Sequence, residues 1–357
     1  MSDGFEAFLK ETGATINAKL EEYIKRQESE RYIGKLLGRS GYKFDFEAFK
    51  KAIIEPAWYL VGIGGKRWRP AMMYLVIEAL GKDPNDYIEF LLIPEVIHNA
   101  TLIHDDIEDN SDTRRGQPAV HKKYGLDIAN NLGDFMYFFP IVAMVDSNRL
   151  PKETKDRMLE VYVREMLRVC TGQSLDIAWH NHLVDPYKIT DDMYLEMVYD
   201  KSGVLASMAA KLGAIIAGAD DETVNQLGHL SGVIGVAFQI QDDYLNLYPS
   251  KLAESKGGVG DDISEGKITL LVTHTINKAT QADRSRLIDI LKMHTKDRAL
   301  IDEAIAIIDR YDAKDYCRKV QEKLVKEAWA AIDKKLPPSK AKERLMELTE
   351  FLATRSY

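Results

Sequence analysis

Residues 158–170 read MLEVYVREMLRVC, and the apolar side chains in this stretch recur three and four positions apart. That spacing places them on one face of an α-helix, which has about 3.6 residues per turn. Sustained alternation of apolar and polar residues, which would indicate half-buried strands, is absent from the chain. The sequence therefore predicts an all-α fold, a single large bundle of about ten or more helices. The same helical spacing recurs in segments 203–218, 227–247, 282–292, 299–311 and 315–333.

No shift in composition divides the chain into several domains. Residues 1–40 are highly charged and poor in apolar side chains, so we expect a helical extension or mobile arm there. Residues 41–357 are expected to form one domain. Within it, Pro337 and Pro338 precede an amphipathic segment, 340–357, which should form a final helix packed on the body of the protein.

Charge and composition narrow the class of protein. The 357 residues include 48 Lys and Arg against 56 Asp and Glu, a formal net charge of −8, which argues against a general nucleic-acid binder. The longest apolar stretch, 135–145, is broken by Pro140 and is shorter than the ~20 residues of a membrane-spanning helix. Two cysteines, Cys170 and Cys317, cannot build a disulfide framework, and the N-terminus lacks a signal-peptide pattern. We therefore expect a cytoplasmic protein without a transmembrane segment.

A first acidic cluster lies in residues 93–109, IPEVIHNATLIHDDIED, whose apolar positions fit a buried helix. Asp105 and Asp109 follow His98 by seven and eleven residues, which places each of them within about 20° of His98 around the helix. They should form one stripe. A solvated helix face is the simpler interpretation of such a cluster taken alone.

A second acidic cluster lies in residues 235–247, GVAFQIQDDYLNL. Gln239, Asp242, Asp243 and Asn246 share one face of an otherwise apolar helix. Buried carboxylates are costly unless something compensates them, although hydrogen bonds within the core could do so. Two such clusters in one helical chain, with oxygen ligands in place of His or Cys clusters, favour Mg²⁺ sites of the kind used in phosphate chemistry.

Cations gather in loops beside both clusters. Residues 64–70, GGKRWRP, combine a glycine turn, three cations and a proline that opens a helix, which suits a diphosphate at a helix N-terminus. Arg114 and Arg115 directly follow the first acidic cluster, and Lys256 and Lys267 follow the second. Each cation alone is more often solvated surface than ligand. Together they predict two diphosphate substrates, one bound through metal and one bound directly by cations.

Taken together, these motifs resemble those of a known family. GGKRWRP, HDDIEDNSDTRRGQP and FQIQDDYLNL, followed by Lys256 and SEGK, are similar to the motifs of the trans-isoprenyl diphosphate synthases, in the same order over residues 50–275. DDIEDNS before RRGQP, and DDYLNL in place of DDxxD, most resemble the geranylgeranyl diphosphate synthases. The resemblance implies the isoprenoid synthase fold, a helical bundle around a central active-site cavity, in a homodimer. It also implies a prenyltransferase that condenses isopentenyl diphosphate head-to-tail with dimethylallyl, geranyl or farnesyl diphosphate, with the released diphosphate as the usual base.

The resemblance also assigns residues, motif by motif. It implies about two or three Mg²⁺ ions bridging the allylic diphosphate and bound by Asp105, Asp109 and Asp242. It implies that isopentenyl diphosphate is held by Lys66, Arg69, His98 and Arg115. The residues implied for the allylic diphosphate are Arg114, Lys201, Ser202, Gln239, Asn246, Lys256 and Lys267. Two of these depart from the family pattern: Asn246 stands in place of Asp and supplies no charge, and Ser202 stands where Thr is commoner.

Product length is predicted from side-chain size. Ala100 and Thr101, one turn before Asp105, are small where a farnesyl-making member of the family usually has an aromatic floor. Tyr137 and the two phenylalanines that follow it, on the next predicted helix, could form a deeper floor or simply be core. The prediction is a C20 product, with C15 and C25 as alternatives. A class I terpene cyclase or a non-catalytic helical protein is disfavoured, because the second diphosphate pocket and nearly all motif residues are present.

Overall fold

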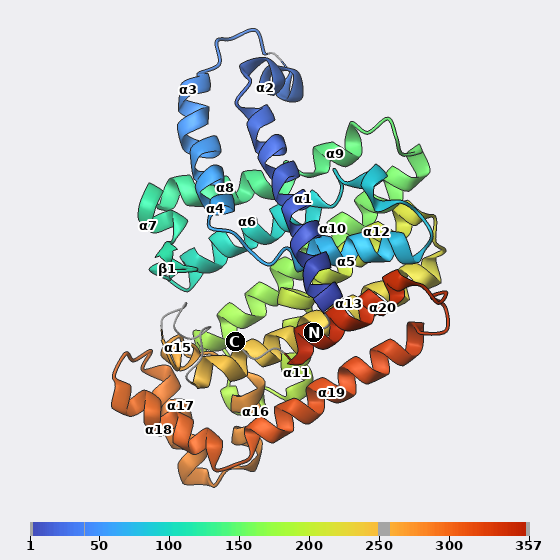
Figure 1. Cartoon of the computed structure of the whole chain (residues 1–357). Helices are drawn as coiled ribbons and strands as arrows, with labels where there is room; N and C mark the ends of the chain where they lie inside the picture. The colour runs from blue at the N-terminus through green and yellow to red at the C-terminus, as the bar shows by residue number, and fades with distance from the viewer. Residues whose placement is uncertain (1–2, 39, 249–257, 355–357) are drawn as a thin grey trace.

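The computed structural model describes residues 3–38, 40–248 and 258–354. Within these ranges the regular structure is helical apart from one hairpin, in which β1 (Thr113–Arg114) pairs antiparallel with β2 (Gln117–Pro118) (Figure 1). The hairpin turn uses Arg115 and Gly116, both with positive φ (52° and 75°), a pair of conformations that closes tight hairpins. The all-α prediction is confirmed, and the short hairpin is the element that periodicity did not predict.

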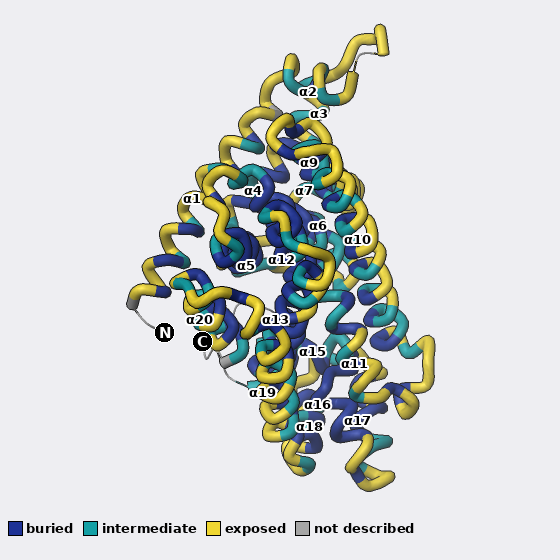
Figure 2. The backbone as a smooth tube through the Cα atoms, turned by 90° about the vertical axis from the view of Figure 1, so that its right-hand side faces the viewer, coloured by how far each residue is buried: buried dark blue, intermediate teal, exposed yellow. Residues whose placement is uncertain are grey.

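The centre of the bundle is α12 (Val204–Ala217), which packs against α5 (Trp68–Ala79), α10 (Lys152–His180) and α13 (Asp221–Leu247). Its sequence, VLASMAAKLGAIIA, is apolar on nearly every side, so the helix is buried all round, as the dark interior of Figure 2 shows. It ends at Gly218, whose φ of 85° suits a residue without a Cβ.

A second part of the core lies between α1 (Asp3–Gln27), α4 (Glu55–Gly62), α6 (Leu92–Glu108) and α8 (Leu126–Phe138). The apolar face of α1 is buried there through Ile16, Leu20 and Ile24. Residues 3–27 are therefore helical and packed on the body, whereas the domain boundary at residue 40 stays a prediction. The tip above this core in Figure 1 is formed by α2 (Glu30–Leu37), α3 (Phe46–Phe49) and the π-helix η1 (Lys50–Ile54).

The third part of the core lies at the opposite end of the molecule, where the C-terminal helices pack around the end of α13 (Figure 1). The last helix, α20 (Lys340–Thr354), packs against α5 and α13, as expected for residues 340–354; residues 355–357 lie outside the described chain. The remaining elements are η2 (Pro84–Tyr87), α7 (Val120–Tyr124), α9 (Ile141–Val145), η3 (Pro186–Lys188), α11 (Asp191–Val198), η4 (Tyr199–Gly203), α15 (Asp261–Ser264), α16 (Leu270–Lys278), α17 (Gln281–Lys292), α18 (Arg298–Asp309) and α19 (Ala313–Ile332).

One stretch of the described chain, Leu126–Val145, is long and apolar enough to cross a membrane by length and composition alone. It is not one continuous helix, because α8 ends at Phe138 and α9 begins after Pro140. Several of its apolar side chains point outward, and Phe138 is 69% exposed. The stretch is therefore two short helices, partly buried in the body of the protein, with several exposed apolar side chains.

Candidate active site

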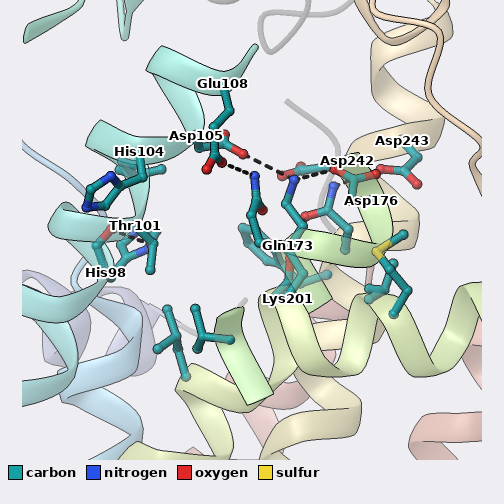
Figure 3. Close-up of a pocket in the computed structure, with 18 of the residues that line it drawn as sticks. His98, Thr101, His104, Asp105, Glu108, Gln173, Asp176, Lys201, Asp242 and Asp243 are labelled. Atoms are coloured by element: carbon teal, nitrogen blue, oxygen red, sulfur yellow. Dashed lines mark hydrogen bonds and ion pairs between the residues drawn. The ribbon is translucent and has the colours of Figure 1, made fainter. Parts of the chain in front are cut away.

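A cavity of about 850 Å³ opens between α5, α6, α10, η4 and α13. Figure 3 shows carboxylates reaching into it from three of these helices, with Asp105 from α6, Asp176 from α10 and Asp242 from α13. Lys201 and Gln173 lie between them. The two acidic clusters, 137 positions apart in the chain at Asp105 and Asp242, therefore meet in one cavity.

Asp105 lines the cavity, as do Glu95 and Glu108 from the same stretch of sequence. The Oδ1 atom of Asp105 lies 3.1 Å from Lys201 Nζ, and its Oδ2 lies 3.4 Å from Arg114 Nη2. Burial alone would raise the pKa of Asp105, but Lys201, Lys267 and Arg114 hold it far below the usual range. Asp105 is therefore a permanent negative charge held at the edge of the cavity.

Asp109 lies one turn further along the same stripe but is not among the residues lining the cavity. It is the C-terminal cap of α6, and its Oδ2 lies 3.1 Å from Lys267 Nζ. Lys267 also pairs with Glu265 and does line the cavity. Lys267, which follows the second cluster in sequence, is therefore joined to the first cluster through Asp109.

Asp106 flanks the stripe and is buried under Arg114, whose Nε donates to Asp106 Oδ1 at 2.8 Å. Burial raises the pKa of Asp106 to about 6, although Arg114 lowers it. Burial would lower the pKa of Arg114, but the carboxylates of Asp106 and Asp105 raise it above its usual value. This pair fixes Arg114 beside Asp105, at the predicted position for an allylic diphosphate.

The second cluster divides its side chains between the cavity and the core. Gln239, Asp242 and Asp243 all line the cavity, and Asp243 is the more deeply buried of the two carboxylates. Asn246 is fully buried, and its Oδ1 accepts a hydrogen bond from the backbone N–H of Asp262 at 3.0 Å. Asn246 is not among the cavity-lining residues, so its carboxamide holds the start of α15 in this structure.

Lys201 and Ser202 reach the cavity from η4, a single π-helical turn between α11 and α12. Such turns are frequent at functional sites because the extra residue re-aims side chains. Lys201 Nζ lies 2.6 Å from Asp176 Oδ2. A Cβ at Gly172 on α10 would overlap the backbone nitrogen of Lys201, so the close approach requires glycine there.

Asp176 and Gln173 are two of the cavity residues that sequence reasoning missed; Glu108, Tyr194 and Asp262 are others. Gln173 and Asp176 follow the predicted helix 158–170 as its continuation in α10. The available signal was a polar pair, Gln173 and Asp176, spaced i, i+3 on a helix whose next turn is apolar. That pattern is common on solvated helices, so it does not identify a site by itself.

The other end of the cavity is cationic. Lys66, Arg69, His98 and Arg115 all line it, as predicted. Burial lowers the pKa of His98 well below its usual range, and the charges of Arg69 and Arg115 lower it further. His98 is therefore neutral, able to donate one hydrogen bond and accept another.

Arg67 lies between Lys66 and Arg69 in sequence and also lines the cavity, but its guanidinium is paired. Its guanidinium is buried, donates to Glu95 at 2.5 Å, and donates through Nε to Asn17 of α1 at 2.8 Å. The backbone at Arg67 has a φ of 51°, so the chain reverses there before α5 begins. This reversal presents the two neighbouring cations to the cavity.

Lys256, which the resemblance assigns to the allylic diphosphate, lies outside the described residues.

The cavity extends from the carboxylates between α6, α8 and α10, where Thr101, Tyr137 and Val169 line it. The ring of His104 stacks on Tyr137 with 5.1 Å between centroids. Ala100 and Phe139 are buried elsewhere in the core, and Phe138 faces outward. Of the side chains considered for the cavity's depth, Thr101 and Tyr137 are the two that line it.

Among the described residues, no three acidic, His or Cys side chains are arranged to hold a metal ion. The donor set nevertheless fits Mg²⁺, because Asp105 and Asp242 offer only oxygen ligands and leave positions for water and phosphate. The ammonium group of Lys201 lies 3.1 Å from Asp105 Oδ1. The position beside this carboxylate therefore already accepts a cationic group.

Comparisons with known proteins agree with this geometry. Residues 50–308 match the Polyprenyl synthetase family. The chain is 35% identical over 307 residues to the short chain isoprenyl diphosphate synthase of Methanothermobacter thermautotrophicus, which covers 86% of this chain and 91% of that one. It is 35% identical over 319 residues to the geranylfarnesyl diphosphate synthase of Natronomonas pharaonis, covering 84% and 89%.

A solved structure, the geranylgeranyl pyrophosphate synthetase from Pyrococcus horikoshii, superposes with a TM-score of 0.83 at 32% identity and covers 99% of both chains. The fold, the paired carboxylates and the cationic pocket all lie within or beside the matched region. The chain therefore belongs to the polyprenyl synthetase family of isoprenyl diphosphate synthases, which are prenyltransferases.

Proposed function

We propose that the protein acts in the cytoplasm and condenses isopentenyl diphosphate with allylic diphosphates to make geranylgeranyl diphosphate. The observation that carries this proposal is that one cavity is lined by two groups of charged side chains. One group is the carboxylates with Lys201 and Arg114, called here the carboxylate end, and the other is Lys66, Arg69, His98 and Arg115, called the cationic end. Two diphosphate substrates need such separate sites, with the reacting carbons between them.

The carboxylate end is the proposed allylic site. Asp105 and Asp242, with Asp109 behind them, would hold Mg²⁺, which when bound supplies positive charge to the departing diphosphate. Lys201, Arg114 and Lys267 neutralise the same charge directly. The allylic C–O bond breaks, and its electron pair leaves with the diphosphate. The double bond of isopentenyl diphosphate then forms the new C–C bond, and the released diphosphate takes the proton that is lost.

The cationic end is the proposed isopentenyl diphosphate site. Fixed cations there bind the diphosphate without metal, as Arg and Lys do at other phosphate sites. Neutral His98 adds a hydrogen-bond donor and no further charge. This binding holds the nucleophilic double bond toward the allylic carbon, so catalysis is mostly positioning and charge stabilisation.

A C20 product is the proposed chain length. Thr101, one turn before Asp105, is small and lines the cavity, and we take the Tyr137 ring, which also lines it, as the floor. One relative is named a geranylfarnesyl synthase and a superposable structure a geranylgeranyl synthetase, so C25 and C20 both occur among similar proteins. The aromatic side chain at position 137 supports the shorter of these two products.

The test of the proposed reaction is a diphosphate-release assay with isopentenyl diphosphate and farnesyl diphosphate. Release should require both substrates and Mg²⁺, and excess EDTA should abolish it. Release from farnesyl diphosphate alone would instead indicate hydrolysis or cyclisation, and would contradict the proposed condensation.

We also propose a homodimer. The outer surfaces of α8 and α10 expose large apolar side chains, and exposed apolar surface often marks an interface. These side chains are Leu126, Phe138, Val163 and Leu167.

Leu167→Glu is therefore expected to shift the protein from twice its 40.5 kDa chain mass to a monomer, because a charge would be buried in the interface. Light scattering coupled to size exclusion measures the mass. Leu183→Glu is the matched control, since Leu183 is similarly exposed beyond the end of α10. A monomeric wild-type protein, or a dimeric Leu167→Glu variant, would refute this interface.

A further inference from the structure

Tyr194 lies outside every motif that pointed to the site, yet its hydroxyl reaches the allylic end of the cavity. The residue is on α11 and is 1% exposed. Its hydroxyl donates to Asp243 Oδ2 at 2.6 Å. Asp243 is itself buried next to Asp242, so Tyr194 and Asp243 form a buried, hydrogen-bonded pair within the lining of the cavity.

This pair continues into a chain of hydrogen bonds that ends in the cavity. Gln239 Nε2 donates to Asp243 Oδ1 at 2.7 Å. Ser202 Oγ donates in turn to Gln239 Oε1 at 3.2 Å. The chain thus joins α11, α13 and η4, and its last two members are residues proposed to contact the allylic diphosphate.

The chemistry of the carboxylate fixes the orientation of the amide. An ionised carboxylate only accepts hydrogen bonds, so Gln239 must turn its NH₂ group toward Asp243. Rotating the amide by half a turn would bring Gln239 Oε1 against Asp243 Oδ1, an unfavourable contact between two acceptors. Tyr194 occupies the other oxygen of Asp243 and so holds that carboxylate in place.

The orientation matters because the oxygens of a diphosphate also only accept. The NH₂ group of Gln239 has two N–H donors, and Asp243 uses one of them. The second N–H of Gln239 is the donor that the substrate can use, because the single hydroxyl proton of Ser202 is donated to Gln239 Oε1. A Gln239 amide that turned freely would offer an acceptor to the substrate for part of the time.

We propose that Tyr194 is a positioning residue for the allylic diphosphate, acting through Asp243 to lock the Gln239 amide with its donor side toward the substrate. The inference rests on the proposed function, because it takes that end of the cavity as the allylic site. Tyr194 is remote in sequence from both acidic motifs. Its loss should change the affinity for the allylic diphosphate and leave the affinity for isopentenyl diphosphate unaffected.

Tyr194→Phe is expected to weaken binding of an unreactive farnesyl thiodiphosphate about tenfold, measured by titration calorimetry with Mg²⁺. The KM for allylic substrate should rise by a similar factor, with the KM for isopentenyl diphosphate within about twofold and kcat little changed. Tyr316→Phe is the matched control, because its hydroxyl donates to Asp191 Oδ2 on the same helix at 2.6 Å and neither residue lines the cavity. That control should bind the analogue like the wild type.

A double-mutant cycle separates positioning from general destabilisation. In a Gln239→Leu background, Tyr194→Phe should change analogue affinity by less than about twofold, because the residue through which it acts is gone. Equal losses in both backgrounds, or wild-type affinity in Tyr194→Phe, would overturn the inference. Asp243→Asn, which breaks the chain at its centre, gives the same test if Tyr194→Phe does not fold. A wild type that binds the analogue but forms no product would contradict the proposed function and leave this binding test valid.

Discussion

Asp105→Asn is expected to lower kcat about 1000-fold, the size of loss that follows removal of a charge-stabilising group from a preorganised site. The carboxylate of Asp105 lies 3.1 Å from Lys201 Nζ and 3.4 Å from Arg114 Nη2, and those cations keep it ionised. Asparagine has the same shape but no charge, so it is a poor ligand for Mg²⁺. The remaining activity should require a higher Mg²⁺ concentration.

The fold should survive this substitution. Lys201 keeps its second partner, Asp176, at 2.6 Å, so no buried ammonium group is left unpaired. The melting temperature, followed by circular dichroism, should therefore stay within a few degrees of the wild type.

Asp112→Asn is the matched control, because Asp112 lies in the loop after α6 and pairs only at the surface with Lys122, at 3.0 Å. It should retain wild-type kcat and Mg²⁺ dependence. A folded Asp105→Asn variant with turnover near that of the wild type would remove Asp105 from the metal site.

Tyr137→Ala is expected to change the main product from C20 to C25 or longer. The phenol ring lines the cavity below Thr101 and is backed by His104, whose ring stacks on it at 5.1 Å. Alanine removes the ring and lengthens the space available to the growing chain. Ala is a good helix former, so α8 should persist, with a stability loss of up to about 3 kcal/mol for the lost packing. Products would be dephosphorylated and sized by chromatography.

Phe138→Ala is the control for this substitution. Its side chain is the neighbouring aromatic on α8, but it is 69% exposed and does not line the cavity. Its product should remain C20. An unchanged C20 product from Tyr137→Ala would show that another side chain sets the length.

The helices were predictable because they depend on local spacing. Apolar residues at three and four positions indicated α10, α12, α13 and the C-terminal helices before any contact was known. The β1–β2 hairpin was not predictable by this route, since it depends on two consecutive residues with positive φ, one of them Arg115. The π-helical turn that carries Lys201 was also hidden, because it follows from the tight approach of Gly172 on a distant helix.

The site residues that belong to a motif with several charges were predictable from the sequence. Site residues that stand alone in the sequence were less predictable. Helical geometry placed Asp105 and Asp109 on one stripe, but whether each faces the cavity depends on the end of α6 and on Lys267, far along the chain. Asn246 shares a face with Asp242, yet it bonds to the backbone of Asp262 because α15 begins there. Asp176 and Tyr194 come from helices with no motif, and only tertiary packing brings them to the site.

The most direct test of the account is to size the products made by the wild-type protein. Purified protein with Mg²⁺ and isopentenyl diphosphate would be given dimethylallyl, geranyl or farnesyl diphosphate in turn, and the products would be dephosphorylated and identified. The account predicts a dominant C20 alcohol from all three primers. Absence of any elongated product from folded protein would contradict the condensation itself, and a dominant C15 or C25 alcohol would contradict the role assigned to Tyr137.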